Sequence, residues 1–275
     1  MKYSIIQQIK VLTDQQRLLI RQLAKEQQEK NHLQFKLDPN VIEATQEGNI
    51  SHFLLMDGNQ LQAYMLTNFY NTTELEVTMI AVTPNQFKEF LQLAITEAQA
   101  HQLIHLLLAI DPMDHSTVVL AKDSGLTFDA AEYRLVFNGK IPISKQLELN
   151  MRPAVHADKQ LIDEMDTEAF GEHGNLSLSD LLLFQLAEVN GQVIGKVRLE
   201  ETRDTVGIFA FVVIPSQRGK GYGTEILTRV IQEKQQARID YIYLEVSLDN
   251  PSALKLYEAC GFEKEATFDY YQLQI

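Results

Sequence analysis

Two stretches of the chain repeat the same order of apolar and polar segments. Each begins with a short apolar segment and an amphipathic helix pattern, and continues through a hairpin signal to a strand that ends at a proline. Helix, strand, helix and strand patterns then follow. The paired landmarks are Asp57-Gly58 with Asn190-Gly191, Pro84 with Pro215, and Gly125 with Gly261. This order predicts an α/β fold with a mixed sheet, present in two tandem copies.

The segment NGKIPISK, residues 138–145, carries glycine, proline and serine and is the predicted boundary between the copies. We therefore expect one domain over residues 1–140 and a second over residues 147–275, both of ordinary domain size. After Pro84 the first copy passes directly into a helix pattern, without a glycine loop or a basic pair. We expect the first domain to be a degenerate, catalytically silent copy.

The second copy carries a distinctive stretch at residues 208–231. An apolar run rich in β-branched residues predicts a buried strand that Pro215 ends, and an amphipathic helix pattern follows. The connecting loop contains Arg218, Gly219, Lys220, Gly221 and Gly223. The first turn of a helix has N–H groups without partners, and glycines admit the backbone close to a phosphate. The stretch is therefore either an anion-binding loop or an ordinary strand-to-helix turn.

A second motif, EVSLDNPSALKLYEACGF, occupies residues 245–262. Asp249 or Asn250 can cap a helix, and Gly261 suits its end. Glu245 lies in the middle of the preceding strand pattern, where burying a carboxylate is costly unless it is solvated or used. Tyr257 lies on the apolar side of the helix pattern.

The loop sequence R-x-x-G-x-G and the later sequence N-x-x-A-x-x-L-Y-x-x-x-G-F together resemble the GNAT family of N-acetyltransferases. The resemblance covers residues 147–275, whereas residues 1–140 share only the layout. It implies the acyl-CoA N-acyltransferase fold. It also implies direct transfer of an acetyl group from acetyl-CoA to a primary amine in a ternary complex.

The resemblance assigns roles residue by residue. Tyr257 matches the general acid of the family, although an aromatic residue that packs the helix on the sheet would look the same. Glu245 is the best candidate for the base, against the alternative of a solvated carboxylate at the cleft wall. A backbone N–H near Val213 would bind the carbonyl oxygen of the intermediate. The residues expected to bind acetyl-CoA are Val212, Val213, Ile214, Arg218, Gly219, Lys220, Gly221, Tyr222, Gly223, Thr224 and Asn250.

Composition narrows the class of protein. The formal net charge of −13 disfavours nucleic-acid binding, which requires clustered lysine and arginine. The only cysteine, Cys260, allows no intrachain disulfide, and the histidines show no metal-ligand spacing. No signal peptide or membrane-spanning stretch is visible in the sequence. We therefore expect a cytoplasmic protein without a metal, a membrane or a nucleic-acid partner.

Several alternatives remain open from the sequence. A CoA-binding regulatory or interaction module without catalysis is possible, although such a module has no need of Tyr257 and Glu245. The donor could be a longer acyl-CoA. The acceptor could be a protein N-terminus, a lysine, a polyamine, an amino sugar, an amino acid or an antibiotic. Glu172 and His173 are candidates for acceptor contacts, or else part of a solvated loop, and the chain could be a monomer or a homodimer.

Overall fold

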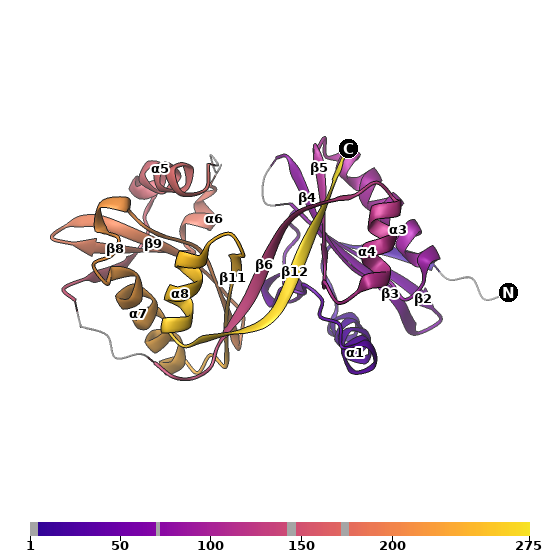
Figure 1. Cartoon of the computed structure of the whole chain (residues 1–275), viewed down its shortest axis with the longest axis horizontal. Coiled ribbons are helices and arrows are strands. Elements are labelled where there is room, and N and C mark those ends of the chain that lie inside the picture. Colours follow the sequence, from indigo (N-terminus) through magenta and orange to yellow (C-terminus); the bar gives the residue numbers. More distant parts are fainter. Residues whose placement is uncertain (1–4, 70–71, 142–146, 172–175) are drawn as a thin grey trace. The chain divides into compact units, whose positions relative to one another are not determined.

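The computed structural model describes residues 5–69, 72–141, 147–171 and 176–275. The chain divides into two compact units (Figure 1). Unit 1 comprises residues 1–133 and 266–275, and unit 2 comprises residues 134–265. Both have a mixed sheet with helices, so the predicted α/β fold in two copies is confirmed. The division differs from a single cut at residues 138–145 because the final strand of the chain returns to unit 1.

Unit 1 is built from five strands and four helices of its own. These are β1 (Ile5–Ile9), α1 (Asp14–Asn31), α2 (Pro39–Ile42), β2 (Ile50–Asp57), β3 (Gln60–Asn68), β4 (Glu74–Ile80), α3 (Pro84–Ala100), β5 (His105–Ile110) and α4 (His115–Asp123). The sheet follows the order β1-β2-β3-β4-β5, in which β4 and β5 are parallel and the other neighbours are antiparallel.

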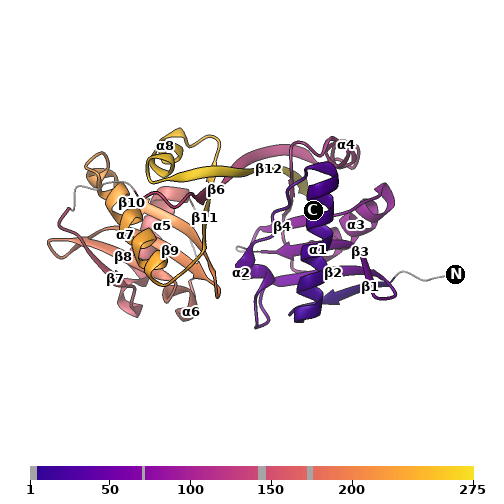
Figure 2. The ribbon, with the colours of Figure 1, turned by 90° about the horizontal axis from the view of Figure 1, so that it is seen from below.

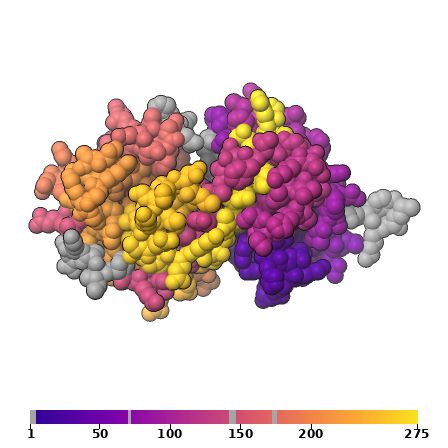
Figure 3. Space-filling model, viewed as in Figure 1, coloured from indigo at the N-terminus to yellow at the C-terminus, as the bar shows by residue number. Residues whose placement is uncertain are grey.

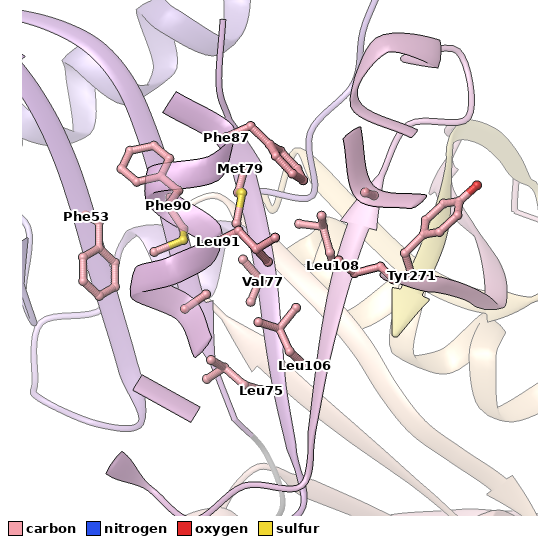
Figure 4. Close-up of a cluster of buried hydrophobic side chains, with 14 of the residues drawn as sticks. Phe53, Leu75, Val77, Met79, Phe87, Phe90, Leu91, Leu106, Leu108 and Tyr271 are labelled. Carbon is pink, nitrogen blue, oxygen red and sulfur yellow. The ribbon is translucent and has the colours of Figure 1, made fainter. Parts of the chain in front are cut away.

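Two cores cover the two faces of the sheet in unit 1, because successive residues of a strand point to opposite sides. On β2, Phe53 and Leu55 join the core beneath α3, while Leu54 joins the core beneath α1. The cluster beneath α3 is drawn in Figure 4. Burial on both faces explains why the strands read as nearly continuous apolar runs in the sequence.

Unit 2 repeats this plan. Its elements are β7 (Asn150–Pro153), a 3₁₀ turn η1 (His156–Asp158), α5 (Lys159–Phe170), α6 (Leu178–Leu181), β8 (Phe184–Val189), β9 (Gln192–Glu201), β10 (Thr205–Val213), a 3₁₀ turn η2 (Pro215–Gln217), α7 (Tyr222–Gln236), β11 (Tyr241–Ser247) and α8 (Pro251–Ala259). The sheet follows the order β11-β10-β9-β8-β7. Figure 2 shows α7, in orange, lying against the strands of this unit.

Two long strands are divided between the units. Strand β6 (Thr127–Phe137) begins in unit 1 and ends in unit 2, whereas β12 (Phe262–Gln274) begins in unit 2 and ends in unit 1. In unit 1 the end of β12 pairs antiparallel with β5, from Asp269 opposite Ile110 to Gln274 opposite His105. In unit 2, β6 is the neighbour of β11. Each unit therefore completes its sheet with a strand segment from the other half of the sequence.

The two predicted hairpins differ in detail. Asn190 and Gly191 both have positive φ and form the two-residue turn that their sequence predicts. In unit 1, Asp57 pairs with Gln60, so the turn lies at Gly58 and Asn59 and not at Asp57-Gly58. Among the described residues, no helix combines the length and apolar character that crossing a membrane requires.

Candidate functional site

Strand β10 changes its pairing halfway along. Its parallel pairing with β11 extends as far as Ile208, which lies opposite Leu244. On the other edge, its register with β9 shifts between Phe209 and Val212, which indicates a β-bulge. Within the bulge, Ala210 has a φ of +43°, a left-handed conformation that costs a non-glycine residue about 1–3 kcal/mol. The bulge therefore lies just beyond the point where the paired region with β11 ends.

The loop after β10 leads into the N-terminus of α7. Gly219 has a φ of +73° and Gly221 a φ of +91°, so both adopt a backbone conformation that side chains disfavour. Gly221 is the N-cap of α7, and no side chain caps the helix. The first-turn N–H groups therefore have no capping partner from a side chain, which is the arrangement of an anion site.

Gly223 serves a different purpose from the other two loop glycines. A Cβ at Gly223 would lie 3.1 Å from Leu256 of α8, so this glycine lets the two helices approach closely. On the face shown in Figure 3, α8 (yellow) is exposed at the surface of unit 2. A substitution at Gly223 would therefore disturb packing as well as any bound anion.

Fewer peptide groups are available to a ligand at Val212–Ile214 than the sequence predicts. The N–H of Ile214 donates to Ile194 of β9 at 2.9 Å, and its carbonyl accepts from Gln217 at 2.9 Å. Because alternate residues of a strand turn their peptide groups to opposite neighbours, Val213 faces the side from which β11 has diverged. The Val213 carbonyl accepts from Arg218 Nε at 2.8 Å, which ties the loop to the strand.

Two further residues of the expected acetyl-CoA site have partners within the protein. Asn250 is the N-cap of α8 and accepts from the Ala253 N–H at 3.1 Å, as its position after β11 predicts. Lys220 is exposed, and its Nζ contacts Gln217 at 3.0 Å. An exposed lysine at a helix N-terminus can turn toward a phosphate, because a surface hydrogen bond contributes little.

Tyr257 lies on α8 and is 8% exposed. Its ring packs near Phe211 of β10, with centroids 6.4 Å apart, and near Phe262 at 6.1 Å. Burial, with a smaller contribution from Cys260, raises the pKa of Tyr257 to about 12. The phenol therefore keeps its proton at physiological pH, and it lies beside the bulged part of β10.

Glu245 on β11 forms an ion pair that the sequence did not reveal. Arg134, from the end of β6, donates to Glu245 Oε1 from Nη2 at 2.8 Å and from Nε at 3.1 Å. The guanidinium also lies 5.1 Å from the ring centroid of Tyr243. Both charged side chains are nearly buried, at 6% and 10% exposure. The pair therefore holds the Glu245 carboxylate in one position, with a cation directly beside it.

A second buried ion pair lies between β9 and α5. Lys196 is fully buried, and its Nζ donates to Asp166 Oδ1 at 2.5 Å and to the Ala210 carbonyl at 3.3 Å. Burial lowers the pKa of Lys196, and the hydrogen bond that it donates to Asp166 opposes that change. Nothing in the sequence indicates this pair, since a lysine between apolar residues in a strand resembles an ordinary surface position.

The other residues that the sequence singled out are Glu172, His173 and Cys260. Glu172 and His173 lie outside the described residues. Within the described ranges, no group of His, Cys, Asp and Glu side chains is arranged to hold a metal ion. Cys260 is a buried free thiol whose pKa burial raises to about 11, so it is no nucleophile at neutral pH.

Comparison with known protein families gives a match in this part of the chain. The family model described as "Acetyltransferase (GNAT) family" matches residues 148–262. Spermidine N(1)-acetyltransferase of Vibrio cholerae is 31% identical over 85 residues, which are 30% of this chain and 49% of that protein. The [ribosomal protein bS18]-alanine N-acetyltransferase of Escherichia coli is 33% identical over 92 residues, or 33% of this chain and 61% of that one. The chain thus spans less than two thirds of each relative.

Solved structures resemble the chain over nearly its whole length. A GCN5-related N-acetyltransferase from Sphaerobacter thermophilus matches 98% of this chain and 95% of its own, with a TM-score of 0.74 and 16% identity. A tandem GNAT protein from the clavulanic acid biosynthesis pathway matches 99% of this chain and 98% of its own, with a TM-score of 0.66 and 10% identity. At such identities the likeness shows the fold, including its tandem arrangement.

Proposed function

We propose that this chain belongs to the acetyltransferase (GNAT) family, whose model matches residues 148–262, and that unit 2 is an acetyl-CoA-dependent N-acetyltransferase. One observation carries the proposal: β10 diverges from β11 at a bulge and leads directly to the uncapped N-terminus of α7. An exposed peptide edge followed by a helix N-terminus suits a ligand with an amide-containing arm and a pyrophosphate. The alternative of a CoA-binding module without catalysis would not require Tyr257 beside the bulge.

Acetyl-CoA supplies an activated thioester, and the loop residues fit its anionic part. The pyrophosphate would contact the N–H groups from Gly219 to Thr224, with Arg218 and Lys220 contributing positive charge. The pantetheine arm would pair with Val213 in place of a neighbouring strand. In this proposal Asn250 contributes as the cap that fixes the start of α8, and unit 1 binds no acetyl-CoA.

In the proposed reaction, the neutral amine nitrogen attacks the thioester carbonyl carbon, and the carbon–sulfur bond breaks as the tetrahedral intermediate collapses. The amine proton passes through water to the carboxylate of Glu245, which Arg134 holds in place. The developing charge on the carbonyl oxygen requires a backbone N–H donor from the bulged part of β10. The immediate products are the N-acetyl amine, the CoA thiolate and the proton on Glu245, and protonation of the thiolate to free CoA uses one proton in turn.

Tyr257 would act on the departing sulfur. A free cysteine thiol has a pKa near 8.5, and an alkyl thiol such as that of CoA is likewise more acidic than Tyr257, whose pKa is about 12. Full proton transfer from the phenol to the thiolate is therefore uphill, and the hydroxyl stabilises the sulfur mainly as a hydrogen-bond donor. The thiolate then takes its proton from solvent. This refines the general-acid role that the sequence resemblance implies.

The acceptor class in this proposal is an amine. The two relatives above are named for spermidine and for an alanine of ribosomal protein bS18. Both are primary amines, so we propose a primary amine here as well. A screen should include spermidine and short peptides with a free N-terminus.

Calorimetric titration of acetyl-CoA tests the proposal. We expect one equivalent to bind to the wild type, and Gly221→Asp to abolish that binding by adding a carboxylate at the anion site. Gly221→Asn is the matched control, because it has the same shape and backbone strain without the charge. Equal losses in both variants would assign the effect to strain. Two equivalents would show that unit 1 also binds, and no binding would refute the acetyltransferase proposal.

A further inference from the structure

Lys196 contacts the one strained peptide of the candidate site. This side chain has no exposed surface, although it starts from the middle of β9. Its Nζ lies 3.3 Å from the carbonyl oxygen of Ala210, the residue with positive φ in the bulge of β10. An ammonium group is therefore held against the bulge from inside the protein.

The rest of the pocket around the ammonium group fixes its position. Asp166 of α5 accepts a hydrogen bond from Nζ at 2.5 Å. The ring centroids of Phe184 and Phe170 lie 4.7 Å and 5.9 Å from Nζ. A carboxylate on one side and aromatic faces on the others leave the cation little freedom to move. The Ala210 carbonyl thus meets a donor whose place is set by three other side chains.

The orientation of the Ala210 carbonyl determines that of the next N–H group. The Ala210 carbonyl and the Phe211 N–H belong to one planar trans peptide, so they point in opposite directions. Holding the carbonyl on Lys196 therefore directs the Phe211 N–H away from the side of Lys196. Phe211 is also the residue whose ring packs near Tyr257.

Resting on the proposed acetyltransferase function, we propose that Lys196 is a positioning residue that orients the Phe211 N–H toward the acyl carbonyl oxygen. The hydrogen bond from Lys196 to the Ala210 carbonyl, called the clamp below, would act through the Ala210–Phe211 peptide, and Lys196 would not touch the substrate. It gives the Ala210 conformation the support that a strained residue requires from its surroundings.

Two observations favour this role over a purely structural one. A buried ion pair rarely makes a fold more stable than apolar residues of similar size would, so stability alone does not account for Lys196. Unit 1 offers the comparison, since its strands β3 and β4 pair from Tyr64–Ile80 to Asn68–Glu76 without a register shift. Strand β3, with the sequence QLQAYMLTN, contains no lysine. The β10 bulge and Lys196 thus occur together in unit 2, whereas the pairing of β3 with β4 has no register shift and β3 has no lysine.

The test uses the full-length protein and two variants. Lys196→Met removes the donor but also leaves Asp166 without its lysine partner. A general loss of stability could then not be told apart from the loss of positioning. The double variant Lys196→Met with Asp166→Leu removes both charges, and we expect it to regain most of the stability. Lys234→Met is the control, because Lys234 is also buried, at 5% exposure, and pairs with Glu201 and Glu233 at the far end of α7.

Hydrogen–deuterium exchange of the free protein is the first readout. In the double variant, we expect the peptide covering residues 209–213 to exchange at least about tenfold faster, while peptides from β8 stay unchanged. Lys234→Met should leave the 209–213 peptide as in the wild type. Unchanged exchange in the double variant would overturn the clamp, whatever the activity of the enzyme.

Steady-state kinetics is the second readout. We expect the double variant to lose about 10²-fold in kcat, with the Kd for acetyl-CoA changed less than about twofold, because a displaced oxyanion donor affects only the transition state. A wild-type kcat in the double variant would overturn the positioning role. If the wild type itself fails to bind acetyl-CoA, the proposed function falls, and exchange alone then decides whether Lys196 holds the bulge.

Discussion

The two helices that follow the proline-containing turns, α3 in unit 1 and α7 in unit 2, begin in opposite ways. At α3, the Thr83 side chain accepts from the Gln86 N–H at 3.3 Å, and the Gln86 side chain accepts from the Thr83 N–H at 3.0 Å. Pro84, at the first helical position, has no N–H to offer. At α7, the cap is Gly221, which has no side chain. One fold thus contains a helix N-terminus capped by its own side chains and another without a side-chain cap, where we propose that an anion binds.

The strands that lead into these helices, β4 in unit 1 and β10 in unit 2, also differ in regularity. Strand β10 bulges and leaves β11, whereas β4 keeps an unbroken register with β3. In unit 1, Lys36 lies over β4, pairs with both carboxylate oxygens of Glu76 at 2.9 Å, and accepts a hydrogen bond from Thr78 at its carbonyl. Strand β4 of unit 1 thus carries hydrogen-bonded polar side chains in a regular strand, whereas β10 of unit 2 has a bulge. Function, where proposed, coincides with local departures from regular structure.

The largest effect is expected at Tyr257, whose counterpart by sequence in unit 1 is Ala121. Tyr257→Phe keeps the ring packing on Phe211 and removes the hydroxyl, so kcat should fall about a thousandfold while the Kd for acetyl-CoA stays the same. Because the pKa is about 12, the wild type should show no alkaline loss of kcat from this group below about pH 11. Tenfold weaker acetyl-CoA binding with normal turnover would contradict the assigned role.

The second largest effect is expected at the ion pair between Arg134 and Glu245. By the alignment of Gly125 with Gly261, the counterpart of Glu245 in unit 1 is Ala109, which cannot form such a pair. Arg134→Met removes the cation from beside a nearly buried carboxylate, and we expect unit 2 to lose about 3–5 kcal/mol in denaturant unfolding. Because Arg134 positions the Glu245 carboxylate, the same variant should also lower kcat. An unchanged kcat would show that Glu245 is not the proton acceptor. Arg134→Met with Glu245→Leu is the matched control for stability.

Unit 1 should be the more acid-sensitive half, because of His52. This buried side chain contacts the Tyr64 hydroxyl at 2.7 Å, and burial lowers its pKa from 6.5 to about 4. Unfolded chains bind the proton first, so stability is complete above pH 6.5 and falls by roughly 3 kcal/mol as the pH drops toward 4. His52→Gln keeps a partner for Tyr64 without titrating, and urea unfolding should then lose that part of the pH dependence. An unaltered dependence would assign it to carboxylates.

The smallest effect is expected at the closed helix end. Thr83→Ala removes the cap of α3 and should lower the stability of unit 1 by about 1 kcal/mol in urea unfolding. Acetyl-CoA affinity should not change, because the site is proposed to lie in unit 2. Any acetyl-CoA binding gained by unit 1 in this variant would show that the cap alone distinguishes the two helix ends.

Periodicity and turn residues predicted much of the fold. The order of elements and the Asn190-Gly191 turn are confirmed, because each depends on interactions between residues close in sequence. The division of the chain into units 1 and 2 depends instead on where the residues of β12 pair, which no local pattern records. The one-residue shift of the first hairpin similarly depends on the register that the cores impose.

The candidate site was predictable in part. The glycine loop and Tyr257 belong to contiguous motifs, so the sequence could indicate them. Arg134, 111 positions before Glu245, becomes its neighbour only through the strand division, and Lys196 meets Ala210 only because a bulge turns a carbonyl. An alanine with positive φ has no signature in sequence, since its side chain offers nothing that favours that conformation.

The division of β6 and β12 between the units bears on how the protein folds during synthesis. Residues 266–275 complete the sheet of unit 1, yet the ribosome makes them after all of unit 2. The N-terminal half must therefore wait with the edge of β5 unpaired, and an exposed strand edge invites pairing with other chains. Contacts between residues so distant in sequence also slow folding. Polypeptides cut between the halves would each lack a strand that the other carries, so we expect the halves to require one another to fold.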